Sequence, residues 1–180
     1  SFGTDPDAVG GQVAAWTRGL QSVGVAACAK HFPGHGDTGE DSHHSLPVID
    51  RSLDQLRERE LVPFAAAIAA GTKSIMSSHI MLPQLDADRP ATLSRSILQG
   101  LLRGELGYEG VIVSDALDMT GASGEIGIPE AAVRAIDAGC DLLCIGTRNT
   151  DEQLSEMEDA ILQAVEDGRR LWRDRRGDGH

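Results

Sequence analysis

The sequence is poor in aromatic side chains and in positive charge. Only 3% of its 180 residues are Phe, Trp or Tyr, and 28 acidic side chains outnumber 16 basic ones, which gives a formal net charge of −12. Such a chain is unsuited to nucleic acid as its main partner, because phosphate binding requires a cationic surface. The longest uninterrupted apolar run, residues 64–70, is also far too short for a transmembrane segment.

Cysteine is scarce as well. Cys28, Cys140 and Cys144 are odd in number and form no CxxC pair, so the sequence does not indicate a disulfide framework. Each stands in an apolar context, and we expect buried free thiols. Free thiols favour a cytoplasmic location. Because the chain begins with Ser1 rather than Met, secretion or lipid anchoring by a preceding segment stays open, and the compartment is not determined.

Short apolar runs alternate with helical patterns along the chain. The runs lack polar alternation, which is typical of buried strands in a parallel sheet. One helical pattern contains Pro63, a residue that bends or splits a helix, and another begins at the N-cap residue Ser94 and ends at Gly107. The expected strands are 25–30, 74–79, 110–114 and 141–145, and the expected helices are 8–20, 53–70, 94–106, 129–138 and 151–166.

This order, one helix followed by four strand–helix units, predicts an α/β fold with a parallel sheet and right-handed crossovers. Residues 1–168 are predicted to form one domain. Residues 169–180 are rich in Arg and Gly and have little to bury, so we expect a flexible basic tail.

Polar residues collect where the expected strands end. The His- and Gly-rich segment 30–44 follows the first strand, His79 ends the second, Asp115 follows the third, and residues 147–149 follow the fourth. Parallel α/β folds build their sites at the carboxyl ends of the strands. The sequence therefore predicts one site at this end of the sheet.

Each of these groups also has a structural interpretation. Asp115 could serve as a helix N-cap, a position that aspartate favours, and His79 could be a hydrogen-bonded histidine of the core. Metal binding is a third alternative, because segment 30–44 holds several competent ligands: His31, His35, Asp37, Asp41 and His43. Convergence of the first two would need a helix, which Pro33 and Gly34 disfavour. We therefore predict neither a metal nor a cofactor.

Asp41 and His43 form the preferred acid/base pair. Residues i and i+2 of an extended segment point the same way, so the carboxylate of Asp41 can contact the imidazole of His43. Such a contact fixes the tautomer and supports a positive charge on the ring. With Asp115 as an ionised nucleophile across a pocket, the arrangement fits retaining glycoside cleavage.

Several motifs then resemble, in the same order, the signature of glycoside hydrolase family 3 β-N-acetylhexosaminidases. The most specific is KHFPGHGDT at residues 30–38. The others are SFGTDP (1–6), DSH (41–43), LP (46–47), SSH (77–79), PATLS (90–94) and SDALDM (114–119).

The resemblance implies a (β/α)₈ barrel of TIM type, of which this chain would hold about the last four βα units, the C-terminal half. It implies removal of terminal β-linked N-acetylglucosamine, often from cell-wall muropeptides, through a covalent intermediate on Asp115. His43, with Asp41 as its partner, would be the acid/base. Lys30 and His31 would bind sugar hydroxyls, and we place His79 with them as a substrate-binding residue.

Two departures accompany the resemblance. The family usually has a second acid directly after the nucleophile, where this chain has Ala116. The family's first half lies outside this chain, so either that half or self-association would be needed to cover the two sheet edges. Two alternative functions stay open: a phosphorylase that uses the same residues, and a non-catalytic fragment.

Overall fold

A single parallel sheet organises the chain. In the computed structural model, which describes residues 2–36, 46–147 and 149–169, the strands lie in the order β1-β2-β3-β4. All three pairings are parallel. The strands are β1 (Cys28–Phe32), β2 (Ser74–Ser77), β3 (Val111–Ala116) and β4 (Leu142–Cys144). The order confirms the predicted α/β fold, and the described residues do not close the sheet into a barrel.

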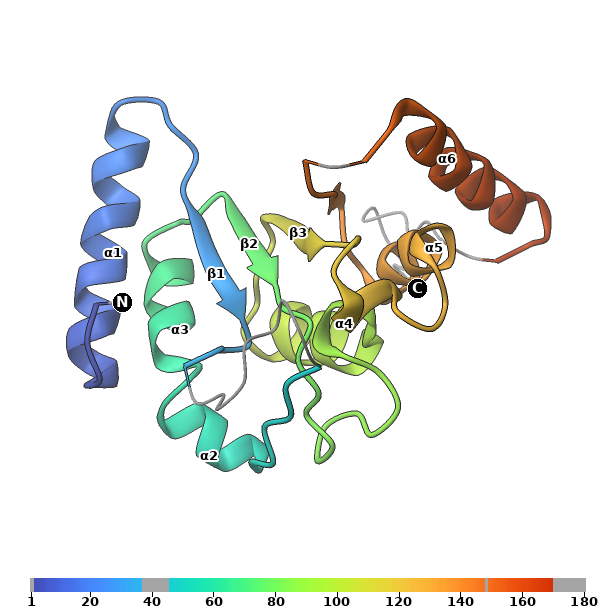
Figure 1. Cartoon of the computed structure of the whole chain (residues 1–180). Helices are drawn as coiled ribbons and strands as arrows, with labels where there is room; N and C mark the ends of the chain where they lie inside the picture. Colours follow the sequence, from blue (N-terminus) through green and yellow to red (C-terminus); the bar gives the residue numbers. More distant parts are fainter. Residues whose placement is uncertain (1, 37–45, 148, 170–180) are drawn as a thin grey trace, which may run out of the picture.

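Helices precede and separate the strands. Figure 1 shows them following the chain across the sheet, from α1 at one end to α6 at the other. Helix α1 packs on α3, and α5 packs on α6. The elements are α1 (Pro6–Ser22), α2 (Leu53–Glu58), α3 (Val62–Ala69), the 3₁₀ turn η1 (Ala91–Leu93), the π-helix η2 (Ser96–Glu105), α4 (Thr120–Ser123), α5 (Ile128–Ala138) and α6 (Asp151–Glu166).

The helix expected over residues 53–70 is two helices. Helix α2 begins with a capping box, in which Ser52 and Gln55 each accept a hydrogen bond from the other's backbone N–H. Helix α3 has Pro63 in its first turn, where the missing N–H of proline costs no helical hydrogen bond. Pro63 therefore splits the helical pattern, since the same ring inside a continuous helix would break it.

The signals expected at the ends of the helix over 94–106 are present. The hydroxyl of Ser94 accepts a hydrogen bond from the backbone N–H of Ile97, at 3.3 Å. The chain leaves the helix through Gly107, whose φ of +65° suits glycine. The helix itself has π geometry over most of its length, which the sequence pattern did not predict.

The two faces of the sheet differ in how they are covered. Ile75 and Ile112 are fully buried and belong to the core formed with the helices. Side chains alternate between the faces of a strand, and on the opposite face Val111 and Leu142 are 40% and 56% exposed. Helices thus cover one face, and the other face is partly exposed. Among the described residues, the outer edges of β1 and β4 have no neighbouring strand.

The cysteine prediction holds only in part. All three cysteines are free thiols, and Cys140 is buried, but Cys28 is exposed and Cys144 is half-buried. Burial was the wrong expectation for Cys28, because this residue begins the edge strand β1.

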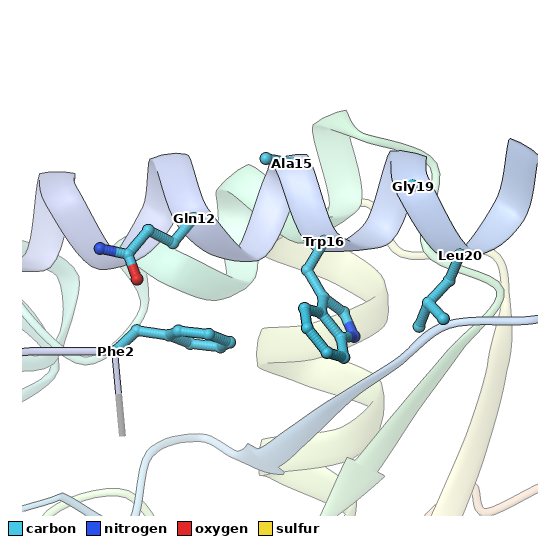
Figure 2. A pocket seen from close by; sticks show the side chains of 6 residues that line it. All are labelled: Phe2, Gln12, Ala15, Trp16, Gly19 and Leu20. Carbon is cyan, nitrogen blue, oxygen red and sulfur yellow. The ribbon is translucent and has the colours of Figure 1, made fainter.

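An apolar hollow of about 540 Å³ lies beside α1. Its lining residues are Phe2, Gln12, Ala15, Trp16, Gly19 and Leu20. Figure 2 shows the side chain of Trp16 on α1 and that of Phe2 near it. The centroids of the two rings are 6.2 Å apart. No helix in the described part of the chain is long and apolar enough to cross a membrane. The predicted tail lies outside the described residues beyond Arg169.

Candidate functional site

Neighbouring strand ends bring the predicted site residues together. Because β1, β2 and β3 are parallel neighbours, their carboxyl ends lie at the same end of the sheet. Lys30 and His31 lie in the second half of β1, and Asp115 is the penultimate residue of β3. The peptide bond between Lys30 and His31 is cis. His79 follows β2, between the two.

Asp115 and His31 form the polar centre of the site. The Nε2 atom of His31 lies 3.8 Å from Oδ2 of Asp115, and their side chains are 30% and 19% exposed. The other carboxylate oxygen, Oδ1, accepts a hydrogen bond from the backbone N–H of Ala116 at 2.8 Å. One oxygen of Asp115 is therefore anchored to the strand, and the other is directed toward the histidine.

The environment of His31 favours a neutral ring. Burial lowers the pKa of His31, and this effect exceeds the opposing attraction of Asp115. The neighbouring Lys30, His35 and His79 lower the same pKa further. A neutral imidazole can both donate and accept a hydrogen bond, which suits contact with the hydroxyl groups of a sugar.

His79 is placed differently from the other predicted site residues. Its side chain is only 1% exposed, and its Nε2 lies 2.9 Å from the backbone oxygen of Ala116. The pKa of His79 is lowered, chiefly by burial. The second ring nitrogen, Nδ1, is buried and has no hydrogen-bond partner among the residues that the structure describes. His79 thus lies beneath the strand end that carries Asp115.

The proposed acid/base pair, Asp41 and His43, lies outside the described residues. The same holds for Asp37 among the candidate metal ligands. No group of three or more His, Cys, Asp or Glu side chains suited to a metal ion occurs in the part of the chain that the structure describes. The acid/base pair and the predicted absence of a metal therefore stay predictions.

Sequence reasoning missed a connection between the ends of β3 and β4. Oδ1 of Asp118 accepts a hydrogen bond from the backbone N–H of Gly146, at 2.8 Å. Ser114 accepts another from the N–H of Cys144, at 2.8 Å. Of the polar residues predicted after the fourth strand, Asn149 donates to the backbone oxygen of Gly146 at 2.8 Å. The sequence signals were Gly146, directly after an apolar run, and Asp118, three residues beyond Asp115.

Fold and candidate site together define a class: an α/β protein with four parallel strands and a carboxylate–histidine pair at their carboxyl ends. The model of the glycosyl hydrolase family 3 N-terminal domain matches residues 1–173. The chain therefore belongs to this family, as the sequence motifs indicated.

Individual relatives agree with this assignment. The chain is 42% identical over 171 residues to a beta-hexosaminidase of Stenotrophomonas maltophilia. This alignment covers 95% of the chain and 48% of the relative. The chain thus spans about half the length of this relative.

Solved structures are similar as well. A family 3 beta-N-acetylglucosaminidase from Paenibacillus is 48% identical with a TM-score of 0.83, covering 87% of this chain and 30% of that one. NagZ from Neisseria gonorrhoeae, in complex with N-trifluoroacetyl-D-glucosamine, is 37% identical with a TM-score of 0.74, covering 95% and 46%.

Proposed function

We propose that this chain forms the C-terminal half of the catalytic barrel of a retaining glycoside hydrolase that removes terminal β-linked N-acetylglucosamine. The observation that carries the proposal is the pairing of Asp115 with His31 at the carboxyl end of the sheet, 3.8 Å apart, in a chain of this family. The names of the relatives support the sugar specificity. Muropeptides from the cell wall are the natural substrates that we propose, and a cytoplasmic location stays a prediction from the free thiols.

The carboxylate geometry supports the following proposed reaction. Oδ1 of Asp115 is held by a backbone N–H, which leaves Oδ2 as the oxygen that attacks the anomeric carbon. A bond forms between Oδ2 and this carbon as the bond to the leaving oxygen breaks, and His43 donates its proton to that oxygen. His43 then removes a proton from water, which attacks the anomeric carbon and releases Asp115. Lys30 and His31 hold sugar hydroxyls.

The proposal needs a second half of the barrel. A closed barrel has eight strands, and β1 and β4 are the edges of the four described here. We propose that a preceding half of a longer chain, or another copy, pairs with these edges. An assay protein that supplies it is a fusion in which the amino-terminal half of the Stenotrophomonas maltophilia relative precedes Ser1.

The test is hydrolysis of 4-nitrophenyl N-acetyl-β-glucosaminide by this fusion and by its Asp115→Asn variant. We expect kcat to fall by at least about 10³-fold, because the nucleophile is lost while its shape is kept. Asp137→Asn is the matched control, since Asp137 pairs only loosely with Arg95, at 3.8 Å, on the surface. A folded fusion without turnover, or full turnover in Asp115→Asn, would refute the proposal. Repeating the assay with inorganic phosphate distinguishes hydrolysis from phosphorolysis.

A further inference from the structure

Three consecutive side chains at the end of β2 lie between the two strand ends of the candidate site. Ser77, Ser78 and His79 are each at most 1% exposed. The hydroxyl of Ser77 shares a hydrogen bond with that of Thr92, at 2.8 Å. Thr92 in turn donates to the backbone oxygen of Ser78, at 2.9 Å. These buried contacts fix the backbone from which Ser78 and His79 project.

Ser78 connects this segment to β1. Its hydroxyl donates a hydrogen bond to the backbone oxygen of Phe32, at 2.8 Å. Phe32 directly follows His31, and both lie in the segment that carries Lys30. The regular pairing of β1 with β2 is interrupted here, because the register shifts between Ala29 and Phe32. The Ser78 hydroxyl thus supplies a contact where the strand ladder is irregular.

His79 connects the same segment to β3. A carbonyl oxygen can only accept, so Nε2 of His79 carries the proton that it donates to Ala116, at 2.9 Å. The N–H of Ala116 in turn donates to Oδ1 of Asp115. The two polar groups of Ala116 are therefore held between His79 on one side and the carboxylate of Asp115 on the other.

The backbone and Cβ of His79 pack closely against α4. A Cβ atom at Gly121, in α4, would lie 3.0 Å from Cβ of His79 and 3.4 Å from its backbone oxygen. Helix α4 follows the turn after Asp115 and so packs directly on the histidine. Burial of this extent favours a role of His79 in placing Asp115 over direct contact with a sugar.

We propose that Ser78 and His79 are positioning residues, with Ser78 holding the end of β1 that presents Lys30 and His31, and His79 holding the end of β3 that presents Asp115. This inference rests on the proposed function, because the reaction is what needs the two ends aligned. Misplacement of a reacting group by about 1 Å can cost roughly 10²-fold in rate. The two residues act on different steps, since one end binds the sugar and the other attacks it.

The experiment compares His79→Leu, His79→Gln and Ser78→Ala in the fusion, by kcat, KM and thermal unfolding. Leucine removes the donor and keeps most of the volume, whereas the amide nitrogen of glutamine can replace Nε2. We expect His79→Leu to lower kcat by roughly 10- to 100-fold with little change in KM, and His79→Gln to recover most of this loss. Ser78→Ala is expected mainly to raise KM. Ser22→Ala is the matched control, because its hydroxyl also donates to a backbone oxygen at 2.8 Å but lies on α1.

Each outcome decides the question. A rise in KM without a loss of kcat in His79→Leu would make His79 a substrate contact and overturn the proposal, as would unchanged kinetics. If His79→Leu does not fold, full activity in His79→Gln supports the proposal and a lasting loss overturns it. In ¹⁵N-labelled protein the proton on Nε2 of His79 should exchange slowly, and a proton on Nδ1 alone would contradict the geometry. Wild-type fusion without turnover refutes the proposed function, whereas equal turnover in wild type and His79→Leu refutes only the positioning role.

Discussion

Gly146 lies two residues after the end of β4, and its surroundings leave no room for a side chain. A Cβ atom at this position would overlap Oδ2 of Asp118 and lie 2.8 Å from its Oδ1. The carboxylate cannot move aside freely, because Oδ1 accepts the N–H of Gly146. Overpacking of this kind costs about 1–3 kcal/mol. Loss of a hydrogen bond to a charged group costs about 1.5–3 kcal/mol.

We therefore predict that Gly146→Ala lowers the free energy of unfolding by about 2 kcal/mol, whichever of the two costs the chain incurs. For a chain of this size each kcal/mol corresponds to a Tm change of roughly 2–4 °C, so Tm should fall by about 4–8 °C. The measurement is urea unfolding of the chain at pH 7, with thermal unfolding as a second probe.

A double-mutant cycle isolates the cause. In an Asp118→Ala background the new methyl group meets no carboxylate, so Gly146→Ala should cost less than about 0.5 kcal/mol, and the two substitutions should be coupled by about 1–2 kcal/mol. Gly11→Ala is the matched control, since a Cβ there meets no atom within 4 Å and Gly11 lies inside α1. It should stabilise the chain by about 0.5–1 kcal/mol. Additive effects of Gly146→Ala and Asp118→Ala would refute the reasoning.

Two further predictions concern pH and a helix end. The pKa of His79 is lowered below its ordinary 6.5, chiefly by burial, so the unfolded chain binds more protons and stability should fall as the pH drops below 6.5. His79→Gln should flatten this slope in urea midpoints measured across that range, leaving the share due to His31, whose pKa is also lowered; an unchanged slope would contradict the assignment. Thr150 forms a capping box with Gln153 at the start of α6, so Thr150→Ala should lower the free energy of unfolding by about 1 kcal/mol. Thr150→Ser should retain it in the same unfolding assay, and an equal loss in both variants would argue against the cap.

The sheet and the place of the site were predictable because they depend on simple rules. Apolar runs without polar alternation identified all four strands, and the parallel order then placed Asp115 and His31 at the carboxyl end of the sheet. Their pairing at 3.8 Å agrees with that prediction. The strand limits were less accurate, since the first strand begins at Cys28 and not at residue 25. Val25 is apolar, but it lies half-exposed in the connection from α1.

The connections that hold the strand ends were not predictable. Ser78 and His79 donate to backbone oxygens, and every residue has such an oxygen, so no pairing of residue types marks these bonds in the sequence. The contact between Asp118 and Gly146 likewise depends on a backbone N–H. The exposure of Cys28 depends on which strand forms the sheet edge, a property of the tertiary fold that an apolar pattern does not encode.

The charge state of the groups around Asp115 connects these observations. Among the described residues, His31 lies within ion-pair distance of this carboxylate. Burial lowers the pKa of the His31 ring. The other contact is a neutral backbone N–H, and His79 holds the next residue as a neutral donor. If Asp115 is the nucleophile, as proposed, a fixed cation at any of these places would attract the electrons that its carboxylate must supply to the anomeric carbon. Neutral donors avoid this penalty, so glutamine, and not lysine, is the replacement that should preserve the proposed positioning role of His79.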